Sequence, residues 1–193
     1  MSESRLKIEN DKMVIQLFKD EADAYMAKAI AKSKRYENIM KGRKSPYGQN
    51  HAHSHFVGMV AEHATLVLME EIEELLGKDL NIDAAFQDDS RDAECDLIVS
   101  GLRIEVKCIK YGSWVRFGPC ISAAQLKNIE KKADVVVWAV YNERKQQFTF
   151  EGFNDVKDIA AIPTIWTGVE GRDKIENHPV LNIIKPLQEM KFC

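Results

Sequence analysis

Residues 96–107 read DLIVSGLRIEVK, and this stretch decides the fold of the surrounding chain. Its two apolar segments flank the pair Ser100-Gly101, a two-residue turn that favours a tight β-hairpin. If these residues form the turn, antiparallel pairing places Asp96 directly opposite Glu105. The sequence therefore predicts two carboxylates that face each other across one hairpin.

Because side chains alternate along a strand, one face of the predicted hairpin is charged and the other is apolar. The charged face carries Glu94, Asp96, Glu105 and Lys107, while the apolar face carries Leu97, Val99, Leu102, Ile104 and Val106. Opposed carboxylates have Cβ atoms about 5 Å apart and repel each other unless a cation lies between them. Mg²⁺ suits that position, because it prefers oxygen ligands and is typically held by one or two carboxylates with water and phosphate.

A lysine completes the predicted set. Lys107 lies two residues beyond Glu105 on the same face, where an ammonium group could orient an attacking water or balance charge that develops on phosphate. Hydrolysis of a phosphodiester is the chemistry that this set suits. The alternative is a hairpin face with ordinary surface charges, because the pattern D…E-x-K alone occurs often by chance.

The residues around the hairpin predict further elements. The pattern indicates a helix at 56–76, a short strand at 80–87, a helix at 122–132 and strands at 134–141 and 147–153. The segment DVVVWAVY at 134–141 is apolar throughout, which is typical of a strand buried on both faces. Asn154 is expected to cap a short helix that runs to about Ala161.

The N-terminal part of the chain predicts a basic helix. Apolar residues recur at helical spacing from Asp11 to about Lys41. Breaker residues at 42–55 then indicate a boundary, so we expect a helical basic arm at 1–50 and a main domain at 51–193. The basic residues of this arm either contact a DNA backbone or form a solvated helix face. These candidates are Lys32, Lys34, Arg35, Lys41, Arg43 and Lys44.

The order of these elements resembles the PD-(D/E)xK nuclease superfamily, the fold of many restriction endonucleases, Holliday-junction resolvases and recombination nucleases. The matching stretch is D96-LIVSGLRI-E105-V-K107, followed by the helix ISAAQLKNIEKK and the strand ADVVVWAVY. Many members carry a Glu on the preceding helix, and G58-MVA-E62-HA matches that position. The match covers roughly residues 56–141, and Cys95 stands where the family often has Pro.

This resemblance implies an α/β fold with a mixed central β-sheet flanked by helices, a restriction-endonuclease-like αβββαβ core. It implies that Asp96, Glu105 and Lys107 are catalytic, that Asp96 and Glu105 bind Mg²⁺ and that Glu62 assists metal binding. Mn²⁺ is expected to substitute for Mg²⁺, and a homodimer is expected. Some members place a Gln or Lys on the next helix near the scissile phosphate, so Gln125 and Lys127 are candidates here. Solvated residues on a short helix are an equal alternative for both.

The sequence leaves the roles of two other groups of residues open. His51, His53 and His55 would share one face of a strand, where they could bind a transition metal or reach phosphate, or they belong to a polar loop. Trp114, Arg116 and Phe117 form either a substrate-side loop or core packing.

The bulk composition restricts the function classes. Hydrophobic residues make up 45% and charged residues 30% of the chain, an ordinary globular balance. The formal net charge of −3 means that a nucleic-acid binder must concentrate its basic residues locally. None of the four cysteines has C-x-x-C spacing, which argues against a zinc site. No signal-like or membrane-length apolar run is visible, so we expect a cytoplasmic protein with no membrane partner.

The sequence thus predicts a Mg²⁺-dependent deoxyribonuclease that acts as an endonuclease. Sequence-specific cleavage, by a restriction-type, nicking or mobile-element enzyme, competes with structure-specific resolution of Holliday-type junctions. A third possibility is a DNA-binding module that keeps the nuclease fold without catalysis. A fourth is a metal-binding regulatory protein that uses the histidines.

Overall fold

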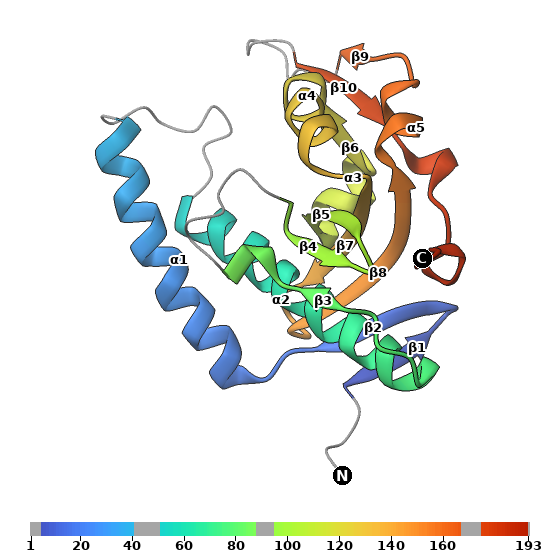
Figure 1. The fold of residues 1–193 in the computed structure, drawn as a ribbon. Helices are drawn as coiled ribbons and strands as arrows, with labels where there is room; N and C mark the ends of the chain where they lie inside the picture. Colours follow the sequence, from blue (N-terminus) through green and yellow to red (C-terminus); the bar gives the residue numbers. More distant parts are fainter. Residues whose placement is uncertain (1–4, 41–50, 88–94, 167–174, 193) are drawn as a thin grey trace.

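The computed structural model describes residues 5–40, 51–87, 95–166 and 175–192. A seven-stranded mixed sheet with the order β1-β2-β8-β7-β5-β4-β3 forms its centre (Figure 1). The strands are β1 (Leu6–Glu9), β2 (Lys12–Gln16), β3 (Ile82–Asp83), β4 (Leu97–Val99), β5 (Leu102–Lys110), β7 (Val135–Asn142) and β8 (Gln147–Asp155). Strands β5 and β7 pair in parallel and every other neighbouring pair is antiparallel, which confirms the predicted mixed sheet.

Helices cover both faces of this sheet. The helices are α1 (Lys19–Met40), α2 (His51–Leu76), α3 (Tyr111–Phe117), α4 (Ala123–Lys132) and α5 (Val156–Ala160). Helix α2 packs its apolar stripe on one face, and α1 lies outside it (Figure 1). Helices α4 and α5 enclose a second core around Trp138 on the other face. The expected helix-flanked arrangement is therefore present.

The elements around the hairpin follow the predicted order, α2–β3–β4–β5–α4–β7. Strand β7 is buried along almost its whole length, as its uninterrupted apolar sequence predicts. Only Ile82 and Asp83 of the expected strand at 80–87 pair with β4, and a short 3-10 helix, η1 (Ala85–Gln87), follows. The unpredicted helix α3 continues directly from β5.

The predicted start of the N-terminal helix, at Asp11, is wrong. Residues 6–16 form the hairpin β1–β2, and the helix begins only at Lys19. Asn10 and Asp11 have φ of 50° and 61°, the left-handed values that a two-residue hairpin turn requires. Strand β2 then pairs with β8, so this segment is part of the central sheet rather than of a helical arm. The predicted boundary near residue 50 falls outside the described residues.

A second correction concerns Asn154. Asp155, rather than Asn154, is the N-cap of α5, and its side chain makes no capping hydrogen bond. Asn154 is fully buried and accepts a hydrogen bond of 2.8 Å from Trp138 Nε1. Its amide also donates to the carbonyl of Ile183. Asn154, predicted as a helix cap, therefore accepts the hydrogen bond that the buried indole N–H of Trp138 requires.

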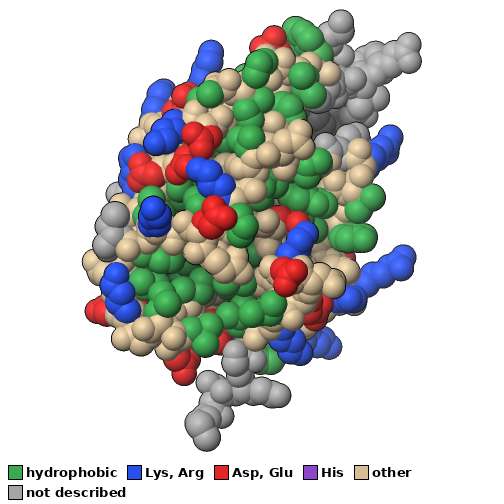
Figure 2. All heavy atoms as spheres, turned by 90° about the vertical axis from the view of Figure 1, so that its right-hand side faces the viewer, with side chains coloured by type: hydrophobic (Ala, Val, Ile, Leu, Met, Phe, Trp, Pro, Cys, Tyr) green, Lys and Arg blue, Asp and Glu red, His purple; other side chains and the backbone are tan. Residues whose placement is uncertain are grey.

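A small second sheet includes part of the C-terminal segment, whose secondary structure was not predicted. Its order is β6-β10-β9, built from β6 (Cys120–Ser122), β9 (Ile165–Trp166) and β10 (Glu176–Pro179). Two 3-10 turns follow, η3 (Leu181–Ile183) and η4 (Leu187–Glu189). On the face in Figure 2, acidic and basic side chains are interspersed rather than separated by sign. None of the described helices combines the length and the apolar character that a membrane span requires.

Candidate active site

The β4–β5 hairpin has the predicted register. Val99 pairs with Leu102 and Leu97 pairs with Ile104, so the next position outward places Asp96 beside Glu105. Asp96 lies just before β4, and its carboxylate Oδ2 accepts a hydrogen bond of 2.7 Å from the Val106 backbone N–H. This bond fixes the Asp96 carboxylate against the strand that carries Glu105. Glu94, which the sequence places on the same charged face, lies outside the described residues.

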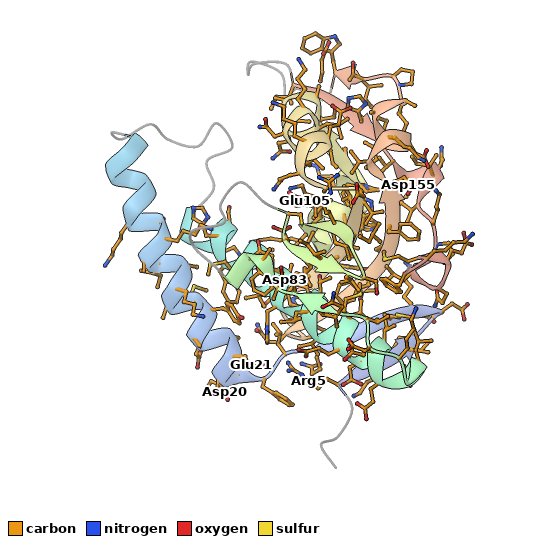
Figure 3. All side chains as sticks on the ribbon, in the orientation of Figure 1. Arg5, Asp20, Glu21, Asp83, Glu105 and Asp155 are labelled. Atoms are coloured by element: carbon orange, nitrogen blue, oxygen red, sulfur yellow. The ribbon has the colours of Figure 1, made fainter. Side chains whose placement is uncertain are left out.

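Glu105 is buried between two lysines. Glu105 is only 5% exposed. It therefore does not lie on an open hairpin face with ordinary surface charges, which was the alternative interpretation of the sequence. Its Oε1 accepts a hydrogen bond of 2.5 Å from Lys107 Nζ. Its Oε2 forms a second ion pair, with Lys132 Nζ 2.6 Å away. Figure 3 labels Glu105 on β5.

The three carboxylates of the candidate site affect one another's ionisation. Burial, and then the charge of Glu105, raises the pKa of Asp96 to about 6, against the Val106 N–H and the nearby lysines. Burial, together with the charges of Asp96 and Glu105, raises the pKa of Glu62 to about 8. The structure therefore brings Glu62 of α2 into electrostatic contact with both acids of the hairpin.

Glu105 behaves in the opposite way. Burial opposes its ionisation, but the ammonium groups of Lys107 and Lys132 outweigh that effect and lower its pKa. One carboxylate is thus held ionised by lysines, while Asp96 and Glu62 hold their protons more readily than usual. A cation bound near these three carboxylates would favour their ionised forms and reduce the repulsion between them.

The sequence prediction missed Lys132, the last residue of α4. Its position follows from topology: α4 connects β5 to β7, which pair in parallel with Glu105 opposite Val136. Lys132 lies only four positions before Val136, so its long side chain can reach back to Glu105. The expected β5–α4–β7 crossover was the signal that could have identified this lysine.

The two other site candidates on α4, Gln125 and Lys127, lie on different sides of the helix. Gln125 lies seven residues before Lys132, which places both on one side of the helix. Lys127 is exposed and projects from a different side. Gln125 is exposed as well, and its backbone N–H donates to Ser122 Oγ at the helix N-cap.

The basic candidates near the N-terminus are only partly described. Lys32 and Lys34 are exposed on α1, and the Lys32 ammonium lowers the pKa of Glu62. Among the described basic candidates, Lys32 is therefore one whose charge reaches the acidic cluster. Arg35 belongs to α1, but its side chain lies outside the described residues, as do the whole of Lys41, Arg43 and Lys44.

The histidine segment is helical, so the expected strand or loop is wrong. Residues 51–55 form the first turn of α2, and the side chain of His51 lies outside the described residues. His53 Nε2 lies 2.6 Å from Glu143 Oε1. Trp114 packs its ring against Trp138, with centroids 6.5 Å apart, so it belongs to the core. The side chain of Phe117 is not among those described.

The donor chemistry of the cluster fits Mg²⁺ better than a closed metal cage. Among the described residues, no group of three or more His, Cys, Asp or Glu side chains is arranged to hold an ion by itself. Mg²⁺ does not require such a cage, since one or two carboxylates with water and substrate phosphate suffice. Asp96 and Glu105 supply that pair of carboxylates, on neighbouring strands of one hairpin.

Comparison of the chain with models of known protein families, with curated proteins and with solved structures gave no significant match.

Proposed function

We propose that the protein is a Mg²⁺-dependent endonuclease that hydrolyses phosphodiester bonds in DNA. The observation that carries this proposal is the position of Asp96, hydrogen-bonded to Val106 N–H, beside the buried, lysine-bound Glu105. Two carboxylates and a lysine on one hairpin form the minimal set for metal-assisted phosphoryl chemistry. The order of elements and the resemblance to PD-(D/E)xK nucleases support the same function.

Each residue has a distinct role in the proposed reaction. Asp96 and Glu105 would hold Mg²⁺, with Glu62 assisting, and the bound ion would polarise the scissile phosphate and lower the pKa of water. Lys107 would position the attacking water and donate to a phosphate oxygen as charge develops there. The water oxygen forms a new bond to phosphorus, the bond to the leaving sugar oxygen breaks, and that oxygen takes up a proton.

DNA is the favoured substrate class because basic side chains lie around the acidic cluster. Lys32 of α1 approaches Glu62, and Lys107 and Lys132 approach Glu105. Such cations offset the repulsion between the acids and a phosphate backbone. A single site cuts one strand, so cleavage of both strands would require the homodimer that we propose for duplex cutting.

The test is cleavage of supercoiled plasmid by wild-type protein and Lys107→Ala, each with Mg²⁺ and with EDTA. We expect nicked or linear DNA from the wild type with Mg²⁺ only, and a loss of at least about 100-fold in Lys107→Ala. Lys110→Ala is the matched control, because Lys110 lies on the same strand but pairs with Glu143.

The product and the substrate range separate the remaining alternatives. Phage genomes offer rare recognition sequences, and a four-way junction offers a branched substrate. Cleavage of only the junction would assign structure-specific resolution. Binding of all three DNAs without cleavage would instead identify a non-catalytic module, and activity that survives EDTA would contradict the metal mechanism.

A further inference from the structure

Lys132 contacts the candidate metal site but has no part in the proposed chemical step. It comes from the end of α4, on a different element from Glu105 and Lys107, and its Nζ lies 2.6 Å from Glu105 Oε2. Its side chain is about a quarter exposed, whereas that of Glu105 is almost fully buried. One carboxylate oxygen of the candidate metal site is thus already covered by a cation from the protein itself.

The two oxygens of Glu105 have different partners. Oε1 accepts a hydrogen bond from Lys107, which lies on the same strand, whereas Oε2 is paired with Lys132, which comes from the end of α4. Oε2 is therefore an oxygen that Mg²⁺ could share only if Lys132 moves away.

Lys132 also interacts with the second acid. Its ammonium lowers the pKa of Asp96, and does so more than the ammonium of Lys107. Burial opposes the charge of Lys132, but Glu105 and Asp96 outweigh it and raise the pKa of Lys132. The charge of Lys132 therefore acts on both carboxylates that a shared divalent ion would need.

We propose that Lys132 is a built-in competitor for the metal site: it neutralises Glu105 in the metal-free protein and must leave Oε2 before Mg²⁺ is held. This inference rests on the metal site of the proposed function and assigns its regulation. Lys132 weakens metal binding in two ways, because it occupies a ligand oxygen and because its charge repels a dication. It also protects the metal-free fold from an unpaired buried carboxylate.

The test measures binding of Mn²⁺ without DNA, from the paramagnetic resonance signal of the free ion. Lys132→Met is expected to bind Mn²⁺ about three- to tenfold more tightly than wild type, the effect of removing one close ammonium. Lys132→Arg, which keeps the charge, should bind no more tightly than wild type. The control is Lys131→Met, at the exposed neighbouring position, which should match the wild type. Unchanged or weaker binding in Lys132→Met would overturn the proposal.

A second measurement uses the wild type, in case Lys132→Met is unfolded without metal. Amine labelling read by mass spectrometry should modify Lys132 more rapidly when Mg²⁺ is added, with Lys131 as internal reference. An unchanged labelling rate would contradict release of Lys132. Wild type that binds no Mn²⁺ would defeat both proposals. Wild type that binds Mn²⁺ but cleaves no DNA would defeat the nuclease function alone.

Discussion

Glu62 is the carboxylate whose charge the metal-free site accommodates least well. Burial and the neighbouring Asp96 and Glu105 raise its pKa from 4.5 to about 8, and Lys32 only partly offsets this. The folded protein therefore holds a proton that an unfolded chain would release near pH 4.5. The stability from this proton is fully present below that pH and is lost as pH rises through about 8.

Glu62→Gln removes this pH dependence. In EDTA at pH 9, we expect the variant to be more stable than wild type by about 1–2 kcal/mol, and at pH 5 no more stable. Chemical denaturation at both pH values measures the difference. Glu70→Gln, at an exposed position two helical turns further along α2, is the control and should behave as wild type. An equal change in stability at both pH values would show that Glu62 is not the group that titrates.

Much of the candidate site could be predicted from the sequence, and there is a physical reason why the rest could not. The pairing of Asp96 with Glu105 follows from a two-residue turn and strand alternation, which are local rules. Lys132 was missed because its contact with Glu105 depends on how α4 crosses over the sheet. The burial of Glu105 was equally invisible, since the charged sequence of the hairpin resembles an exposed face.

At the scale of the elements, the N-terminal hairpin shows how tertiary pairing overrides a local pattern. Residues 13–18 contain apolar positions that fit a helix and a strand equally well. The turn at Asn10-Asp11 and the open edge of β8 decide in favour of the strand, because β2 pairs there and buries Ile15. The same competition explains Asn154, which satisfies a buried Trp138 rather than a helix end.

The hairpin should contribute substantially to stability. Ile15 on β2 is fully buried, whereas Ile8 on β1 is 69% exposed. We expect Ile15→Ala to lower the free energy of unfolding by about 2–4 kcal/mol, through lost burial and a cavity. Ile8→Ala, the same substitution on the paired strand, should change it by less than about 0.5 kcal/mol. Urea denaturation compares them, and similar small effects for both would argue that β2 is not part of the core.

At the scale of the whole molecule, the distribution of charge matters more than its total. The chain carries a net charge of −3, yet Lys32, Lys107 and Lys132 all lie around the acids of the candidate site. The interspersed charges in Figure 2 mark a face with no such concentration. Helices on both faces and a sheet with one parallel pair hold the two halves of the site, α2 and the β4–β5 hairpin, against each other.

The fold class could be predicted because its elements lie consecutively along the chain. The small second sheet could not, because its strands are very short and β10 pairs with the distant β6, where Ile121 lies opposite His178. The close packing at Gly152 could not be predicted from the sequence either. A Cβ at this position would lie 2.2 Å from the Lys185 carbonyl oxygen. Only the packed structure reveals that the C-terminal segment crosses β8 so closely.

The most direct test of the central claim is the single-turnover rate of DNA cleavage by Asp96→Asn, with Mg²⁺, on whichever DNA the wild type cuts. Asp96→Asn keeps the shape of the side chain and its ability to accept from Val106 N–H, but removes the charge that Mg²⁺ needs. We predict a loss of at least about 100-fold, while the exposed Asp83→Asn on β3 stays within about twofold of wild type. Wild-type rates in Asp96→Asn would contradict the assignment of this hairpin as the active site.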